Sequence, residues 1–136
     1  MKKFLRFSLV ALFAVLGMSN AMAEDVTDEL TYSSLGVTGT SYKDWSNKTF
    51  TSNAVYAGNT AGGNEAIQLR SKNNSGIVST TSGGKIKSIT IVWNKATPYS
   101  TSEDNPQSRS VDIYGSNTVY TGTSDLYAAA TQGTKI

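Results

Sequence analysis

The stretch of residues 83–93 constrains the fold of this chain more than any other. It follows a glycine-containing turn and alternates apolar with polar side chains. The alternation places Ile89, Ile91 and Trp93 on one face and Ser88 and Thr90 on the other. Period-two alternation with β-branched residues is typical of a half-buried strand. We therefore expect a central strand here, paired on both sides and joined to residues 76–81 as a hairpin across Ser82–Gly84.

The rest of the chain also favours β structure. Short apolar runs are separated by Gly, Ser, Asn and Thr, and no helical periodicity persists for three turns. Further strands are expected at 29–37, 49–51, 54–57, 66–70 and 111–114, with a polar loop over 41–48 and a long connection over 94–110. The expected core consists of Ile67, Leu69, Ile89, Ile91, Trp93, Val111 and Ile113. At 136 residues, the length suits one domain.

The N-terminus has the features of a secretory signal peptide. Three basic residues precede an apolar run over 7–16, and an Ala-Met-Ala cleavage site ends at Ala23. We expect a signal-peptide helix over 1–23, cleavage after Ala23 and a secreted protein, extracellular or at the cell surface. An uncleaved anchor is the second choice. The mature domain, 24–136, keeps nine of the twelve Lys and Arg against ten Asp and Glu, a net charge of −1. That balance gives no basic face for nucleic acid.

The composition also excludes several kinds of chemistry. The chain contains no Cys, which excludes a lipoprotein anchor, disulfides and thiolate catalysis. It contains no His, which excludes a Ser-His-Asp arrangement and removes the commonest zinc ligand. The spacing of the carboxylates does not predict two that face each other, as glycoside hydrolysis requires. We therefore expect a non-catalytic protein without a cofactor.

Loop aromatic residues are the candidates for ligand binding. Tyr42, Trp45 and Tyr99 could stack on sugar rings, and Glu103 and Asp104 could accept hydrogen bonds from them. The site would lie at the loop end that carries the long connection 94–110, with the polar loop 41–48 as an optional second contributor. The alternatives are that Trp45 caps the sandwich end with Tyr42 packed on it, and that the long connection is disordered. Glu103 and Asp104 also offer hard oxygen ligands, but their spacing fits no calcium loop, and we expect a solvated loop with no metal.

An ordered set of segments resembles a known kind of module. The segments are 68–73, 75–85, 89–94, 111–115 and 131–135. They resemble a jelly-roll-like module at the N-terminus of secreted proteins from gram-negative gut bacteria, some of which carry nuclease-type domains. The resemblance implies an all-β, jelly-roll-like antiparallel β-sandwich. It also implies that further strands follow Lys135, so the domain over 24–136 would be truncated. Arg109 fits the pattern, whereas 95–108 looks like an enlarged loop.

The resemblance brings no settled activity, so three functions stay open. The first is a secreted, non-catalytic β-sandwich that binds a ligand or acts as a spacer beside another domain, with glycan as the first ligand to test. The second is the N-terminal fragment of an extracellular hydrolase, nuclease- or glycosidase-type, whose catalytic domain is absent. The third is a structural surface or adhesin module. Expected partners are a glycan and a downstream domain, with no nucleic acid and no membrane after cleavage.

Overall fold

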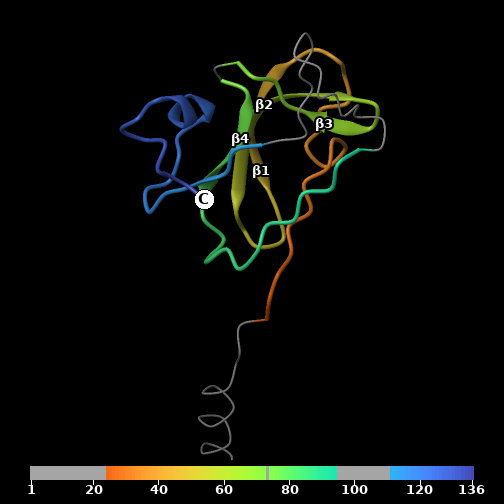
Figure 1. Cartoon of the computed structure of the whole chain (residues 1–136). Coiled ribbons are helices and arrows are strands. Elements are labelled where there is room, and N and C mark those ends of the chain that lie inside the picture. The colour runs from red at the N-terminus through yellow and green to blue at the C-terminus, as the bar shows by residue number, and fades with distance from the viewer. Residues whose placement is uncertain (1–23, 73, 95–110) are drawn as a thin grey trace, which may run out of the picture.

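The fold is organised around one long strand. The computed structural model describes residues 24–72, 74–94 and 111–136. Strand β2 (Val55–Gly63) pairs antiparallel with β1 (Lys43–Thr49) along one edge. Along its other edge it pairs antiparallel with β4 (Gly76–Thr81) and, near its end, with β3 (Ala66–Gln68). Figure 1 shows the four strands as one sheet with β2 at its centre.

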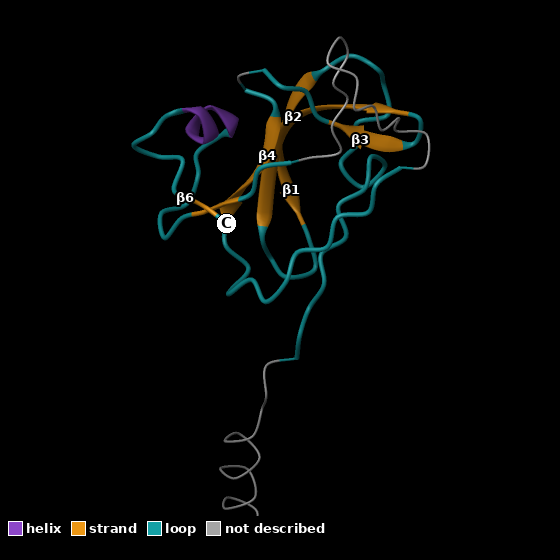
Figure 2. Cartoon of the chain, in the orientation of Figure 1, coloured by secondary structure: helices purple, strands orange, loops and turns teal. Residues whose placement is uncertain are grey.

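The C-terminal part lies against one side of this sheet. Strand β5 (Tyr114–Gly115) pairs antiparallel with β6 (Thr134–Lys135). Between them lies a short 3-10 helix, η1 (Thr123–Tyr127), which Figure 2 shows beside β4. Leu126 from η1 approaches Gly76 so closely that a Cβ there would lie 2.7 Å from it. In the described parts of the chain, we find no helical segment with the length and apolar character that a bilayer crossing requires.

Small residues in β2 allow other segments to pack directly on its backbone. A Cβ at Gly62 would lie 1.4 Å from the carbonyl oxygen of Val37, and the Gly62 amide donates a 2.8 Å hydrogen bond to the Gly39 carbonyl. The segment before β1 therefore lies on the sheet with no side chain between them. The buried apolar side chains in the described residues are Leu35, Val37, Ala54, Ala57, Ala61 and Val78.

The prediction of a central strand over 83–93 is wrong. Residues 85–93 form no strand, and each of them is exposed. The expected hairpin is also absent, because β4 pairs with β2 instead, with Val78 opposite Ala57. Figure 1 shows the segment leaving the end of β4 and running outside the sheet. Alternation predicts on which face of a segment each side chain lies, but a strand also needs a neighbouring strand with which its backbone can form hydrogen bonds.

The predicted core is wrong for the same reason. None of its seven members belongs to the buried set: Ile67 and Ile113 are half-buried, and the other five are exposed. The observed core uses small side chains on β2 and apolar side chains from the turn before β1. Alternation distinguishes two faces of a segment, but it does not show which face another segment covers.

Other observed strands differ from the predicted boundaries, and some are longer and others shorter than expected. Residues 54–57, 66–70 and 76–81 do contain strands, and the first of them extends much further than predicted, to Gly63. Residues 31–36 form a turn, and the predicted loop 41–48 contains most of β1. Of the predicted strand at 49–51, only Thr49 lies in a strand, as the last residue of β1. Of 111–114, only Tyr114 is in a strand. In the turn at 31–36, the Thr31 amide donates a 2.9 Å hydrogen bond to the Ser34 hydroxyl, and the Ser34 amide donates a 3.0 Å hydrogen bond to the Thr31 hydroxyl. These two hydrogen bonds favour a turn over a strand.

Candidate functional site

A pocket of about 530 Å³ lies where the turn before β1 meets the start of that strand. Its volume falls in the range of about 300–1,000 Å³ that is usual for small-ligand sites. The residues that line it are Gly36, Val37, Thr38, Gly39, Thr40, Ser41, Lys43, Asp44, Trp45 and Thr60. The lining residues thus include hydroxyl-bearing residues, one lysine, one aspartate and one tryptophan.

The indole of Trp45 is held in a fixed orientation. Trp45 lies opposite Gly58 in the β1–β2 ladder, and a Cβ on Gly58 would lie 2.3 Å from the indole Cζ2. Nε1 of Trp45 donates a 3.0 Å hydrogen bond to Oγ1 of Thr60, which is fully buried. The glycine leaves room for the ring, and the hydroxyl fixes its rotation. An aromatic ring held in this way is a preorganised part of the pocket wall.

The edge strand β1 contributes two charged residues beside the indole. Lys43 lies opposite Thr60 and Asp44 lies opposite Asn59, and both charged residues are exposed. Oδ1 of Asp44 accepts a 2.8 Å hydrogen bond from Nδ2 of Asn59, a buried residue. This contact orients one carboxylate oxygen inward. Among the described residues, Oδ1 of Asn59 has no hydrogen-bond partner.

The opposite wall of the pocket is a well-defined turn. Leu35 and Val37 are buried, and Gly36 between them has a φ of 71°, a left-handed conformation that glycine adopts without strain. The amide of Val37 donates a 2.9 Å hydrogen bond to the Tyr32 carbonyl, which closes the turn. The hydroxyl-bearing residues Thr38, Thr40 and Ser41 follow directly and are exposed. The anchored backbone thus presents hydroxyl groups along one wall.

The structure separates the two predicted aromatic residues that it describes. Trp45 lines the pocket, whereas Tyr42 is not among the lining residues. The guanidinium of Arg70 instead lies 4.1 Å from the centre of the Tyr42 ring, a cation–π contact. Tyr99, Glu103 and Asp104 lie outside the described residues. Asn94, which precedes them, donates a 2.7 Å hydrogen bond from Nδ2 to the Asn64 carbonyl in the β2–β3 turn.

A second polar cluster lies at the other end of β2. The carboxylate of Asp28 accepts hydrogen bonds from the Ser52 amide at 2.9 Å, the Ser52 hydroxyl at 2.5 Å and the Tyr56 hydroxyl at 3.1 Å. Burial acts to raise the pKa of Asp28, but these hydrogen bonds outweigh it and hold that pKa below its ordinary value. Burial and the neighbouring Asp28 carboxylate raise the pKa of Tyr56. The cluster ties the N-terminal segment to the turn before β2, so its role is structural.

Sequence reasoning missed the residues that shape the pocket. Residues 58–63 are small and glycine-rich, and the strand predicted over 54–57 was not expected to continue through them, as β2 does. Thr60 and the wall at 36–41 were therefore not candidates. The only sequence signal for the contact between Trp45 and β2 is an aromatic residue in a polar stretch together with a distant run of small residues. In the described residues, no group of three or more acidic side chains converges as a metal site would require.

The comparisons with known proteins add no assignment to this geometry. Searches against protein families, curated proteins and solved structures each found no match to this chain.

Proposed function

We propose that this chain is a secreted, non-catalytic β-sandwich module that binds carbohydrate and acts beside another domain. The observation that carries the proposal is the Trp45 indole, fixed by Thr60 in the wall of a pocket that also contains hydroxyls, Lys43 and Asp44. The antiparallel strands are consistent with a jelly-roll-like sandwich. The account of secretion is supported by the basic, apolar and Ala-Met-Ala order of residues 1–23.

The lining chemistry suits a sugar. A pyranose presents an apolar face of C–H groups and a rim of hydroxyls that both donate and accept hydrogen bonds. The indole can contact the apolar face, because burial of apolar surface and C–H contact with a π-system are favourable. Asp44 can accept from sugar hydroxyls while Lys43 donates, and charged partners make the stronger hydrogen bonds. Small-ligand sites obtain their specificity from a small number of polar groups at fixed positions.

The contacts of four described carboxylates support the proposal of binding rather than catalysis. Glycoside hydrolysis uses two carboxyl groups about 5–9.5 Å apart. Asp44 is bonded to Asn59, and Asp28 is bonded to Ser52 and Tyr56. Asp112 forms an ion pair with Lys135 at 2.7 Å, and Asp125 accepts from Thr121. Each of these carboxylates has its contacts with amides, hydroxyls or a cation.

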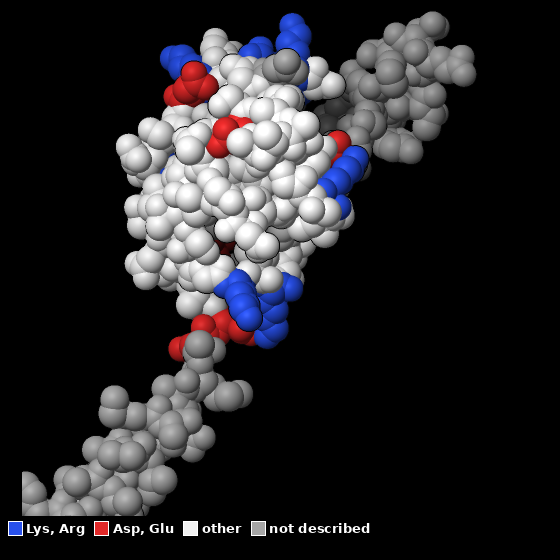
Figure 3. All heavy atoms as spheres, turned by 90° about the vertical axis from the view of Figure 1, so that its left-hand side faces the viewer, with Lys and Arg blue, Asp and Glu red and all other residues white. Residues whose placement is uncertain are grey.

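On the one face shown in Figure 3, the charge distribution gives no support for nucleic acid as the ligand. Figure 3 views the molecule from the side that carries η1 and the β5–β6 ladder, and this face is largely uncharged, with Lys and Arg at its margins. Nucleic acid binding requires clustered cations that follow the phosphates. The lining of the pocket contains a single cationic residue, Lys43, beside one acidic residue, Asp44.

The test is a set of glycan titrations in solution, with ligands selected on a glycan array. Calorimetry on the purified protein reports monovalent affinity, so avidity plays no part. We expect Trp45→Ala to abolish binding and Lys43→Ala to weaken it about tenfold, the effect of about 1.4 kcal/mol. Tyr42→Ala and Trp93→Ala are the aromatic controls and should bind as the wild type does. Binding that survives Trp45→Ala and Lys43→Ala, or no binding to any glycan, would contradict the proposal.

Export has a separate test. Mass spectrometry of the protein recovered outside the cytoplasm should give a chain that begins at Glu24. A membrane-bound chain that still begins at Met1 would contradict the secretion part of the proposal and leave the ligand question to the titrations.

A further inference from the structure

Residues 85–93 form an exposed, extended segment with an unusual load of apolar side chains. Ile86 is 75% exposed, Val92 88% and Trp93 40%, and Ile89 and Ile91 are also exposed. Isolated exposed apolar residues are common on protein surfaces, but several of them close together on one segment indicate an interaction site. This stretch therefore needs a partner.

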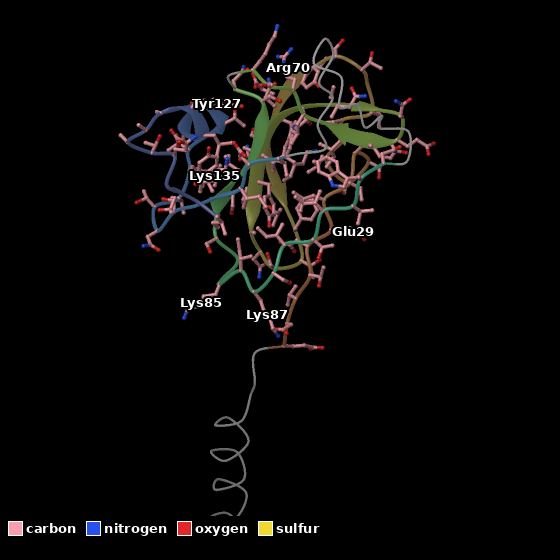
Figure 4. The ribbon with its side chains drawn as sticks, in the orientation of Figure 1. Glu29, Arg70, Lys85, Lys87, Tyr127 and Lys135 are labelled. Carbon is pink, nitrogen blue, oxygen red and sulfur yellow. The ribbon has the colours of Figure 1, made fainter. Side chains whose placement is uncertain are left out.

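The backbone of the same segment is unpaired. Among the residues that the structure describes, no backbone amide or carbonyl of 85–93 has a hydrogen-bond partner. The segment is nevertheless held near both ends, by the Lys87–Asp25 ion pair and by the bond from Asn94 to the Asn64 carbonyl. Figure 4 shows Lys85 and Lys87 at the lower end of the molecule, away from the four-stranded sheet. A tethered, extended segment with open hydrogen-bonding groups is a ready template for another strand.

We propose that this segment pairs with the same segment of a second copy of the chain, antiparallel and centred on Ile89. In that register, Ile89 of one copy lies opposite Ile89 of the other, on the twofold axis. Each residue before Ile89 lies opposite the residue that is the same number of positions after Ile89 in the second copy. Ile86 then lies opposite Val92 of the second copy, and Ser88 lies opposite Thr90. Apolar side chains meet apolar side chains, and hydroxyls meet hydroxyls, which are favourable cross-strand pairs.

Charge gives the same arrangement. The centred register places Lys87 opposite Ile91 and Lys85 opposite Trp93, where the ammonium can lie over the indole as a cation–π contact. A parallel, in-register pair would instead place each lysine beside its own copy, and like charges directly opposite are destabilising. A shift of the centre to Ser88 would place Ile86 opposite Thr90 and Val92 opposite Gly84. The self-complementary pattern thus favours the antiparallel orientation and the register centred on Ile89.

The register gives a sharp test because the chain contains no cysteine. With a short bismaleimide added to purified protein, Ile89→Cys should cross-link efficiently to a covalent dimer. Val92→Cys is the matched control: its side chain is more exposed, but it faces Ile86 of the second copy and should cross-link much less. Equal cross-linking at the two positions, or none at residue 89, would overturn the proposed register.

The oligomeric state tests the same inference without a cysteine. Sedimentation of the wild type should show a concentration-dependent monomer–dimer equilibrium. Ile89→Lys brings two ammonium groups together on the twofold axis and should raise the dimer dissociation constant at least tenfold. Val119→Lys, which adds the same charge at a residue 57% exposed elsewhere, should leave that constant unchanged. A wild type that stays monomeric at 100 µM or more would overturn the proposal. That concentration is about ten to a hundred times a dimer dissociation constant in the micromolar range. A dimer that tolerates Ile89→Lys would overturn it too.

Discussion

Nε1 of Trp45 lies 3.0 Å from Oγ1 of Thr60, and the threonine has no exposed surface. The two residues come from neighbouring strands, and the bond fixes the indole that forms one wall of the pocket. Trp45→Phe keeps a ring but removes the donor, so a buried hydroxyl loses its partner. We expect the free energy of unfolding to fall by about 1–3 kcal/mol, the usual cost of such a loss. Urea denaturation measures it.

A double-mutant cycle separates the hydrogen bond from the change in ring size. Thr60→Val in the Trp45→Phe background removes the orphaned hydroxyl and should restore part of the lost stability. If the two substitutions are simply additive, the 3.0 Å contact makes no energetic contribution.

Gly58 is required by the same ring. Gly58→Ala would place a methyl group 2.3 Å from Cζ2 of Trp45 and 2.8 Å from the carbonyl oxygen of Gly76, which is backbone and yields little. We expect destabilisation of about 1–3 kcal/mol, typical of overpacking, together with weaker glycan binding as the indole moves. Gly122→Ala is the control, since it has an extended φ of −179° and no atom within 4 Å of its Cβ position. The melting temperature of Gly58→Ala should be clearly lower than that of Gly122→Ala. Similar melting temperatures would contradict the tight contact at Gly58.

The Asp28 cluster predicts a specific pH dependence. Its folded-state pKa lies below the ordinary value of 3.8, so its contribution to stability is present above that value. The contribution is lost as the pH falls through the folded-state pKa, because the protonated carboxyl accepts fewer and weaker hydrogen bonds than the carboxylate does. Denaturation measured between about pH 2 and 6 should show Asp28→Asn with a flatter acid limb than the wild type. Asp112→Asn, at an exposed ion pair, should keep the steep limb.

The Tyr42–Arg70 stack should affect stability but not ligand binding. Arg70→Ala removes a cation–π contact at an exposed site, worth about 0.5–1 kcal/mol. Since neither residue lines the pocket, glycan affinity should stay at the wild-type value. A large loss of affinity in Arg70→Ala would mean that the binding surface extends over this stack.

The sequence predicted the β class and several strands because those depend on local pattern. Residues 76–81 and 66–70 are bounded by turns and form strands as expected, though the second strand ends at Gln68. Residues 83–93 carry the strongest alternation and form no strand, since pairing depends on a neighbour that local pattern does not specify. The glycine-rich part of β2 is a strand because Trp45 and the turn at 36–39 pack on it, a tertiary effect that outweighs low strand propensity.

The candidate site was predictable only in part. Trp45 was a candidate because an aromatic residue in a polar stretch suits a sugar, and the structure places it in a pocket wall. Thr60 and residues 36–41 are distant from it in sequence and carry no chemical signal of their own. Their contribution arises from the register in which Trp45 lies opposite Gly58. Tyr42 is only three residues away from Trp45, yet its ring contacts Arg70 instead.

The indole signals of the protein test the central claim most directly. The chain contains two tryptophans, so a ¹H–¹⁵N spectrum should show two indole peaks, and Trp93→Phe assigns them. On titration with a glycan that binds, the Trp45 peak should shift with saturation, while the Trp93 peak stays in place. A Trp45 peak that does not move at saturating glycan, or a shift confined to Trp93, would contradict carbohydrate binding in this pocket.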